Sequence, residues 1–255
     1  MARIILGNTD YFKATLAITA FPRCIYFWIR ETTVISSAAT APIAGLFDGT
    51  GSGNDQADYV EQDRNSSTVK GWATDNNNWV AEGSVAKWST NTWTPVLYMM
   101  DSATSRTLNI GGTSDTGTTS RTPADLNRIV LGIYTDTDDV NYPPSDGVWE
   151  IADFGVVPAT PSAGEITDFI TNAKSGKVVW PAGSYGGRSA EREHWDLDEA
   201  GDLNANVVGT FNSTALVPTG GPANATHPTL DYGGGGGGTL LPPFFNFQPS
   251  TQLRM

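Results

Sequence analysis

Two carboxylates, Glu150 and Asp153, lie in the sequence Trp-Glu-Ile-Ala-Asp-Phe and come closest in this chain to an acid/base pair. Glycoside hydrolysis needs two carboxyl groups that flank the scissile bond, one as acid and the other as nucleophile or base. The surrounding residues predict a β-strand, in which successive side chains point to opposite faces. Because an odd number of positions separates Glu150 from Asp153, we expect them on opposite faces and predict that they do not act together.

Nucleophilic and zinc chemistry find less support in the sequence. The two histidines, His194 and His227, fall in the C-terminal third, and neither adjoins a nucleophile motif such as G-x-S-x-G. Cys24 is the single cysteine, and its apolar surroundings predict a buried thiol that forms no internal disulfide. One cysteine and two distant histidines provide no zinc cluster. We therefore predict no catalytic residues and no enzymatic activity.

Calcium is the one metal that the acidic loops suggest, and no other cofactor is predicted. Hard cations take six to eight oxygen ligands, which such loops can supply. A first loop offers Asp48, Asn54 and Asp55. The candidate ligands in the second loop are the carboxylates of Asp136, Asp138, Asp139 and Asp146, together with the side-chain amide oxygen of Asn141. The alternative interpretation is a solvated acidic loop.

Four aromatic residues in or beside predicted loops could stack on the faces of sugar rings. They are Trp79, Trp88, Tyr134 and Tyr142. The alternative is that these rings pack in the core, as aromatic residues of β-sandwiches commonly do, and an exposed aromatic patch would decide between the two.

Three β-type runs, 93–112, 127–134 and 145–157, are broken by turn residues and predict one antiparallel sheet. Further short runs at 23–30 and 42–48 predict strands, and the runs 58–62 and 67–74 predict a hairpin. One helix is expected, because Ser162 and Glu165 form a capping box. Its apolar face would be formed by Ile166, Phe169 and Ile170, and Gly176 would end it.

The central runs resemble concanavalin A-like and laminin-G-like jelly-roll domains. The residues that carry the resemblance are Trp93, Asp101, Ser102, Arg106, Leu108, Gly111, Gly112, Arg128, Gly132, Asp146, Gly147 and Asp153. The resemblance implies an all-β fold, an antiparallel jelly-roll β-sandwich with one short helix. Retaining glycosidases of this fold carry the pattern E-x-D-x-x-E, which is absent here.

Composition indicates a single hydrophobic core and argues against some classes of binding partner. The 255 residues are 39% hydrophobic and carry a formal net charge of −12, which disfavours nucleic acid and anionic membrane surfaces. The N-terminus has no signal-peptide pattern, and no window is apolar enough to cross a bilayer. We expect a jelly-roll domain over 1–181, an irregular extension over 182–232, and a glycine-rich tether with an apolar docking tail over 233–255.

That tail follows six glycines, Gly233 to Gly238, and is stiffened by prolines. An apolar peptide on a flexible tether predicts docking on a partner, by strand addition or by aromatic anchors in a groove. The predicted partner-binding residues are Leu240, Leu241, Phe244, Phe245 and Phe247.

An all-β domain with such an arm resembles concanavalin A-like structural proteins of tailed bacteriophages. The resemblance implies a non-enzymatic virion component, a capsid decoration or a tail fibre part, made in the host cytoplasm. Its partners would be copies of itself and major capsid or tail proteins. The alternative function is a lectin-like carbohydrate-binding module, with or without calcium.

Overall fold

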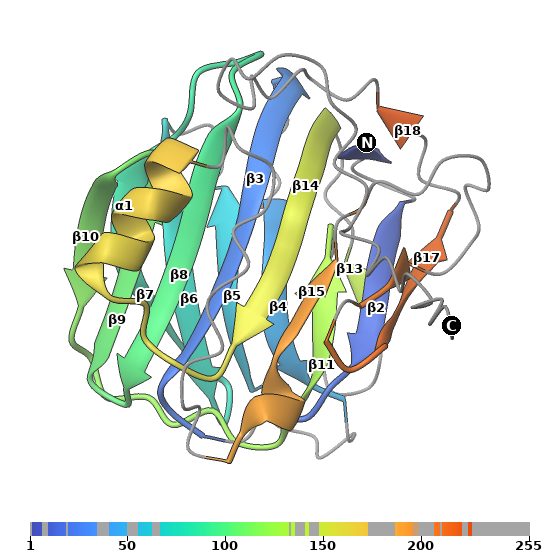
Figure 1. Cartoon of the computed structure of the whole chain (residues 1–255). Coiled ribbons are helices and arrows are strands. Elements are labelled where there is room, and N and C mark those ends of the chain that lie inside the picture. The colour runs from blue at the N-terminus through green and yellow to red at the C-terminus, as the bar shows by residue number, and fades with distance from the viewer. Residues whose placement is uncertain are drawn as a thin grey trace, which may run out of the picture.

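Apolar residues at alternate positions of the strands meet between two antiparallel sheets in a computed structural model of the chain (Figure 1). The predicted all-β jelly-roll sandwich is thus confirmed. The structure describes residues 2–6, 10–18, 20–34, 41–49, 56–62, 67–132, 134–135, 141–142, 148–172, 187–195, 197, 207–209, 211–220 and 224–225. Residues 233–255, which include the predicted docking tail, lie outside this part of the chain.

The front sheet of Figure 1 has the strand order β10-β9-β8-β3-β14-β1-β18, and β15 also pairs with β14. Its strands are β1 (Ala2–Leu6), β3 (Arg23–Thr33), β8 (Thr94–Ser102), β9 (Ser105–Ile110), β10 (Thr113–Gly117), β14 (Val148–Val157), β15 (Glu193–Trp195) and β18 (Asn224–Ala225).

The back sheet has the order β16-β17-β2-β11-β4-β5-β6-β7. Its strands are β2 (Tyr11–Thr15), β4 (Ala41–Asp48), β5 (Ala57–Gln62), β6 (Thr68–Asp75), β7 (Asn78–Ala86), β11 (Leu126–Leu131), β16 (Val207–Val208) and β17 (Ala215–Thr219). A separate two-stranded sheet joins β12 (Tyr134–Thr135) to β13 (Asn141–Tyr142). The predicted hairpin over 58–62 and 67–74 is confirmed as β5 and β6.

The three central runs do not form one sheet, which corrects that expectation. Strands β8 and β9 form a hairpin in the front sheet, and β3 separates them from β14. Strand β11 belongs to the back sheet, between β2 and β4. Each run is apolar enough to be a strand anywhere in a sandwich, so partners from the first 50 residues decide which sheet it joins.

Helix α1 (Ala163–Asn172) lies on the outer face of the front sheet (Figure 1). The predicted capping box is confirmed: the Glu165 N–H donates to Ser162 Oγ at 3.3 Å, and the Ser162 N–H donates to Glu165 Oε2 at 2.7 Å. Phe169 is fully buried and meets Tyr26 edge-on, with ring centroids 5.5 Å apart. The fully buried Cys24 packs in the same outer cluster, as predicted for a small apolar residue.

A buried ion triad connects the two sheets inside the sandwich. Asp58 of β5 pairs with Arg23 of β3 and accepts a hydrogen bond from Arg106 Nε of β9 at 2.9 Å. All three side chains are at most 1% exposed. The remaining donors of Arg106 reach the carbonyls of Ala103 at 2.9 Å and Arg121 at 2.8 Å. The triad fixes this end of the sandwich with charge-assisted hydrogen bonds rather than with apolar packing.

The predicted irregular extension contains strands that join the sandwich. Strand β15 pairs with β14, β17 pairs with β2, and β18 pairs with β1. Glu193 of β15 is fully buried, and its carboxylate accepts backbone N–H groups of His194, Phe211, Asn212 and Thr214 at 2.7–3.1 Å. One buried carboxylate therefore ties the start of β17 to the front sheet.

Candidate functional site

Strand pairing in the back sheet places two adjacent rows of side chains on its outer face, away from the core. The first row follows from the registers that join β17, β2, β11, β4, β5, β6 and β7: Val217, Lys13, Val130, Gly45, Tyr59, Trp72 and Ala81. The second row, two residues further along each strand, is Thr15, Arg128, Phe47, Ala57, Thr74 and Trp79. These rows have different chemistry at their two ends.

The aromatic end consists of Phe47, Tyr59, Trp72 and Trp79. Tyr59 stacks on Trp72 with ring centroids 6.4 Å apart and an interplanar angle of 10°. Its other neighbours are Phe47, at 5.8 Å and 30°, and Trp79, which it meets edge-on at 6.2 Å and 82°. Tyr59 is 4% exposed and Trp79 is 39% exposed, so the cluster presents one solvent-facing indole on a packed base.

Gly45 makes room for this packing. A Cβ built on Gly45 would lie 2.4 Å from Tyr59 Cβ and 2.6 Å from Phe47 Cε2. Any side chain there would collide with the Tyr59 Cβ and with the Phe47 ring, so the absence of a side chain at Gly45 lets Phe47 and Tyr59 pack over it.

A tight hairpin holds Trp79 in place. Asn76 and Asn77, between β6 and β7, have φ of 48° and 64°, as a type I′ turn requires. The neighbouring Asp75 accepts the Thr122 N–H at 2.9 Å, and Arg121 Nε donates to the Asn78 carbonyl at 3.0 Å. Trp79 therefore stands beside an anchored turn rather than on a free loop, which reduces the entropy lost when a ligand binds.

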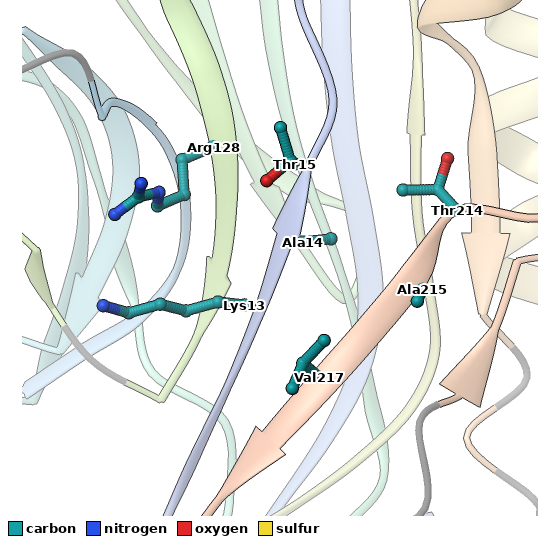
Figure 2. A pocket seen from close by; sticks show the side chains of 7 residues that line it. All are labelled: Lys13, Ala14, Thr15, Arg128, Thr214, Ala215 and Val217. Atoms are coloured by element: carbon teal, nitrogen blue, oxygen red, sulfur yellow. The ribbon is translucent and has the colours of Figure 1, made fainter.

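The opposite end of the outer face forms a pocket of about 470 Å³, here called the cationic pocket (Figure 2). Lys13 of β2 and Arg128 of β11 extend to the same side from neighbouring strands. Apolar and hydroxyl groups complete the lining: Ala14, Thr15, Thr214, Ala215 and Val217. Sequence reasoning missed this pocket, because only the long-range pairing of β2 with β11 and β17 brings its residues together.

The predicted carbohydrate-binding residues have different outcomes. Trp79 is exposed on the aromatic end. Trp88 is 4% exposed and packs in the main core, so its predicted role in stacking on a sugar is corrected by burial. Tyr134 and Tyr142 face each other in register across β12 and β13, and the positions of their side chains lie outside what the structure describes.

The predicted calcium ligands Asp136, Asp138, Asp139 and Asp146, like the predicted docking residues Leu240, Leu241, Phe244, Phe245 and Phe247, lie outside the described residues. Among the residues that are described, no group of three or more His, Cys, Asp or Glu side chains could hold a metal ion. In that same part of the chain, no helix has the length and apolar character to span a membrane.

A β-bulge in β14 corrects the expectation that Glu150 and Asp153 lie on opposite faces of the strand. The register of β14 against β3 shifts between Ala152 and Gly155, and Asp153 has a φ of 50°. The extra residue moves Asp153 to the outer face that also carries Glu150, instead of the opposite face. Glu150 pairs there with Arg30, whose Nε donates at 2.5 Å.

Asp153 instead belongs to a chain of polar groups beneath the C-terminal extension. Its Oδ1 lies 3.8 Å from Nε2 of His194, and Nδ1 of His194 lies 3.0 Å from the Tyr26 hydroxyl. Tyr26 is 1% and His194 3% exposed, so these two members of the chain are buried, whereas the Asp153 side chain is 19% exposed. A Cβ built on Gly155 would lie 2.2 Å from the Tyr26 hydroxyl, so a glycine lets the ring cross β14 here.

No protein-family model and no curated protein matches the chain. Solved structures similar to it include a native heptameric SAP-like pentraxin from Limulus polyphemus, 10% identical, with 67% of this chain and 82% of that chain covered and a TM-score of 0.48. A botulinum neurotoxin serotype D binding domain is 17% identical, with 69% and 48% covered and a TM-score of 0.45. Trypanosoma rangeli sialidase in complex with sialic acid is 12% identical, with 60% and 23% covered and a TM-score of 0.47. This chain thus spans about half of the toxin domain's length, and none of these similarities assigns it a function.

Proposed function

We propose that this protein is a non-enzymatic carbohydrate-binding domain whose ligand stacks on Trp79. The observation that carries the proposal is the solvent-facing indole of Trp79, 39% exposed, held edge-on against the buried Tyr59. An indole ring offers a large apolar face with a polar N–H at its rim, which suits the mixed apolar and hydroxyl surface of a sugar.

The packing of the aromatic end favours a binding role over a purely structural one. A ring needed only for the core would be buried, as Trp88 is at 4% exposure. The hairpin turn and the Tyr59–Trp72 stack restrict the position of Trp79 before a ligand arrives. Such preorganisation improves affinity because less side-chain freedom is lost on binding.

The carboxylates support the non-enzymatic part of the proposal. Glu150 is 7% exposed and pairs with Arg30, and Asp153 faces the enclosed His194. General acid/base catalysis needs carboxyl groups within hydrogen-bond reach of a bound substrate. Neither group opens on the outer face of the back sheet, where the proposed ligand binds.

A saccharide array probed with the full chain, with and without calcium, tests the proposal. We expect binding that Trp79→Ala weakens by about 2 kcal/mol or more, roughly 30-fold in Kd, as for an anchoring tryptophan. The matched control is Trp79→Phe, which keeps an aromatic face and should keep most of the affinity. Binding of no saccharide, or equal binding by all three proteins, would contradict the proposal.

The virion role predicted from the C-terminal arm remains a separate prediction, because residues 233–255 lie outside the described part of the chain. The two roles are compatible: the arm would attach the protein to a larger assembly, and the sandwich would bind surface glycans. The predicted calcium requirement is tested by the calcium arm of the same array.

A further inference from the structure

We infer that the cationic pocket binds the carboxylate or sulfate group of an acidic saccharide, an inference that rests on the proposed function. The pocket and the aromatic end lie on the same face of the back sheet, in the two rows that the strand registers define. Lys13 and Trp72 share one row, four strands apart, which is about 19 Å at the usual strand spacing of about 4.8 Å. The pocket is therefore a second subsite rather than part of the Trp79 stacking site.

Two cationic side chains line the pocket from neighbouring strands and extend to the same side of them (Figure 2). Lys13 lies opposite Val130, and Arg128 lies two residues from Val130 on the same face of β11. Lys13 and Arg128 are thus diagonal neighbours, and the Cα atoms of such residues typically lie about 7–8 Å apart. An anion bound between the two side chains would gain two charge-assisted hydrogen bonds.

The charge contrast points to an anionic ligand. The chain as a whole carries a formal charge of −12, so a pair of adjacent cations stands out against an acidic background. Arg128 is also held in position: a Cβ built on Gly49 would lie 2.7 Å from its Cζ, so the guanidinium lies against the Gly49 backbone. The same overall charge disfavours an extended polyanion such as nucleic acid, because its other charges would meet a repulsive surface.

The remaining lining suits a sugar. Thr15 and Thr214 offer hydroxyl groups, and Ala215 and Val217 form an apolar wall on β17 (Figure 2). Val217 is 45% exposed, so this wall is open to a ligand. A volume of about 470 Å³ is within the usual range for a small-molecule site, which fits one sugar ring and its acidic group better than a long chain.

The β17 wall is fixed from behind by the buried Glu193. Its Oε2 accepts the Thr214 N–H at 3.0 Å, and the Thr214 carbonyl accepts Nε1 of Trp195 at 2.8 Å. A Cβ built on Gly209 would lie 2.1 Å from the Glu193 carboxyl carbon, so the backbone closes tightly around this carboxylate. The wall is therefore rigid before a ligand binds, and Glu193 is a positioning residue for the pocket.

Calorimetric titration of the full chain with matched probes tests the inference. The probes are a galacturonic acid trisaccharide, its neutral methyl ester, a trisaccharide of uncharged sugars that carries one sulfate group, and sodium sulfate. We expect the acidic trisaccharides to bind, the esterified form to bind at least tenfold more weakly, and Lys13→Gln or Arg128→Gln to weaken acidic binding by roughly tenfold or more. Lys13→Arg keeps the charge and should retain most of the affinity.

The outcomes separate this inference from the proposed function. Acidic binding that Lys13→Gln and Arg128→Gln leave unchanged would overturn the pocket assignment while the role of Trp79 survived. Equal affinity for the acid and its ester would overturn the anionic class of ligand. Binding of free sulfate but of no saccharide would overturn both the saccharide assignment here and the proposed function. Circular dichroism spectra that match the unmodified protein establish that each variant is folded.

Discussion

The substitution Asp58→Asn tests the buried ion triad most sharply, because it removes one charge and almost no volume. Asp58 is fully buried, and its two carboxylate oxygens face Arg23 and Arg106, which are 1% and 0% exposed. Nε of Arg23 already has no hydrogen-bond partner, so Arg23 depends strongly on Asp58. The asparagine would leave two buried guanidinium groups with no compensating charge from this position.

The magnitude follows from breaking a buried pair on one side. Removal of one partner of a buried ion pair costs about 3–5 kcal/mol, since the remaining charge stays desolvated. Typical domains have about 5–15 kcal/mol of stability in total, so the variant should lose a large part of it. We expect the melting temperature to fall by about 6–20 °C, at about 2–4 °C per kcal/mol for a domain of this size.

Urea unfolding followed by tryptophan fluorescence measures this loss as a lower midpoint with an unchanged slope. The matched control is Asp125→Asn, at an exposed position just before β11, which should change stability by no more than about 0.5 kcal/mol. Equal midpoints for the two variants would refute the reasoning. A partial recovery in the double variant with Arg23→Met would support it, because that change removes one of the stranded charges.

Burial raises the pKa of the Cys24 thiol well above its usual range, and burial followed by the charge of Asp58 raises that of the Tyr98 hydroxyl. The folded state therefore favours the neutral forms of both groups. Their contribution to the free energy of unfolding should be constant below about pH 8.5, the usual pKa of a thiol in an unfolded chain, and should fall as the pH rises further. Cys24→Ala should delay that fall in a pH series of urea midpoints, and midpoints that stay constant up to pH 11 would contradict this prediction. Gly45→Ala should destabilise the sandwich by about 1–3 kcal/mol and weaken saccharide binding, because its Cβ overlaps Tyr59. Unchanged urea midpoint and affinity would show that the rings move aside easily. Deletion of residues 233–255 should leave the melting temperature unchanged but abolish incorporation into particles, and normal incorporation would end the assembly hypothesis.

Local sequence signals predicted the parts of the fold that depend on neighbouring residues. The capping box of Ser162 and Glu165 and the β5–β6 hairpin were predicted because their partners are a few residues apart. The assignment of strands to sheets was not, since β3 separates β8 from β14 although all three runs are similarly apolar.

The candidate site shows the same division. Trp79 was predicted from a local, polar, asparagine-rich context, and it is exposed beside a hairpin turn. The burial of Trp88 depends on distant strands and could not be read from its neighbours. The bulge at Asp153 overturned a face assignment that counted residues, because one extra residue reverses the alternation.

The most direct test of the central claim is a two-dimensional NMR titration of the indole N–H resonances with a saccharide that binds on the array. The resonance that disappears in Trp79→Phe identifies Trp79, and the buried Trp88 serves as an internal reference. We predict that the Trp79 resonance shifts saturably while that of Trp88 stays in place. A saturable titration in which the Trp79 resonance does not move would contradict the proposal that this face binds the ligand.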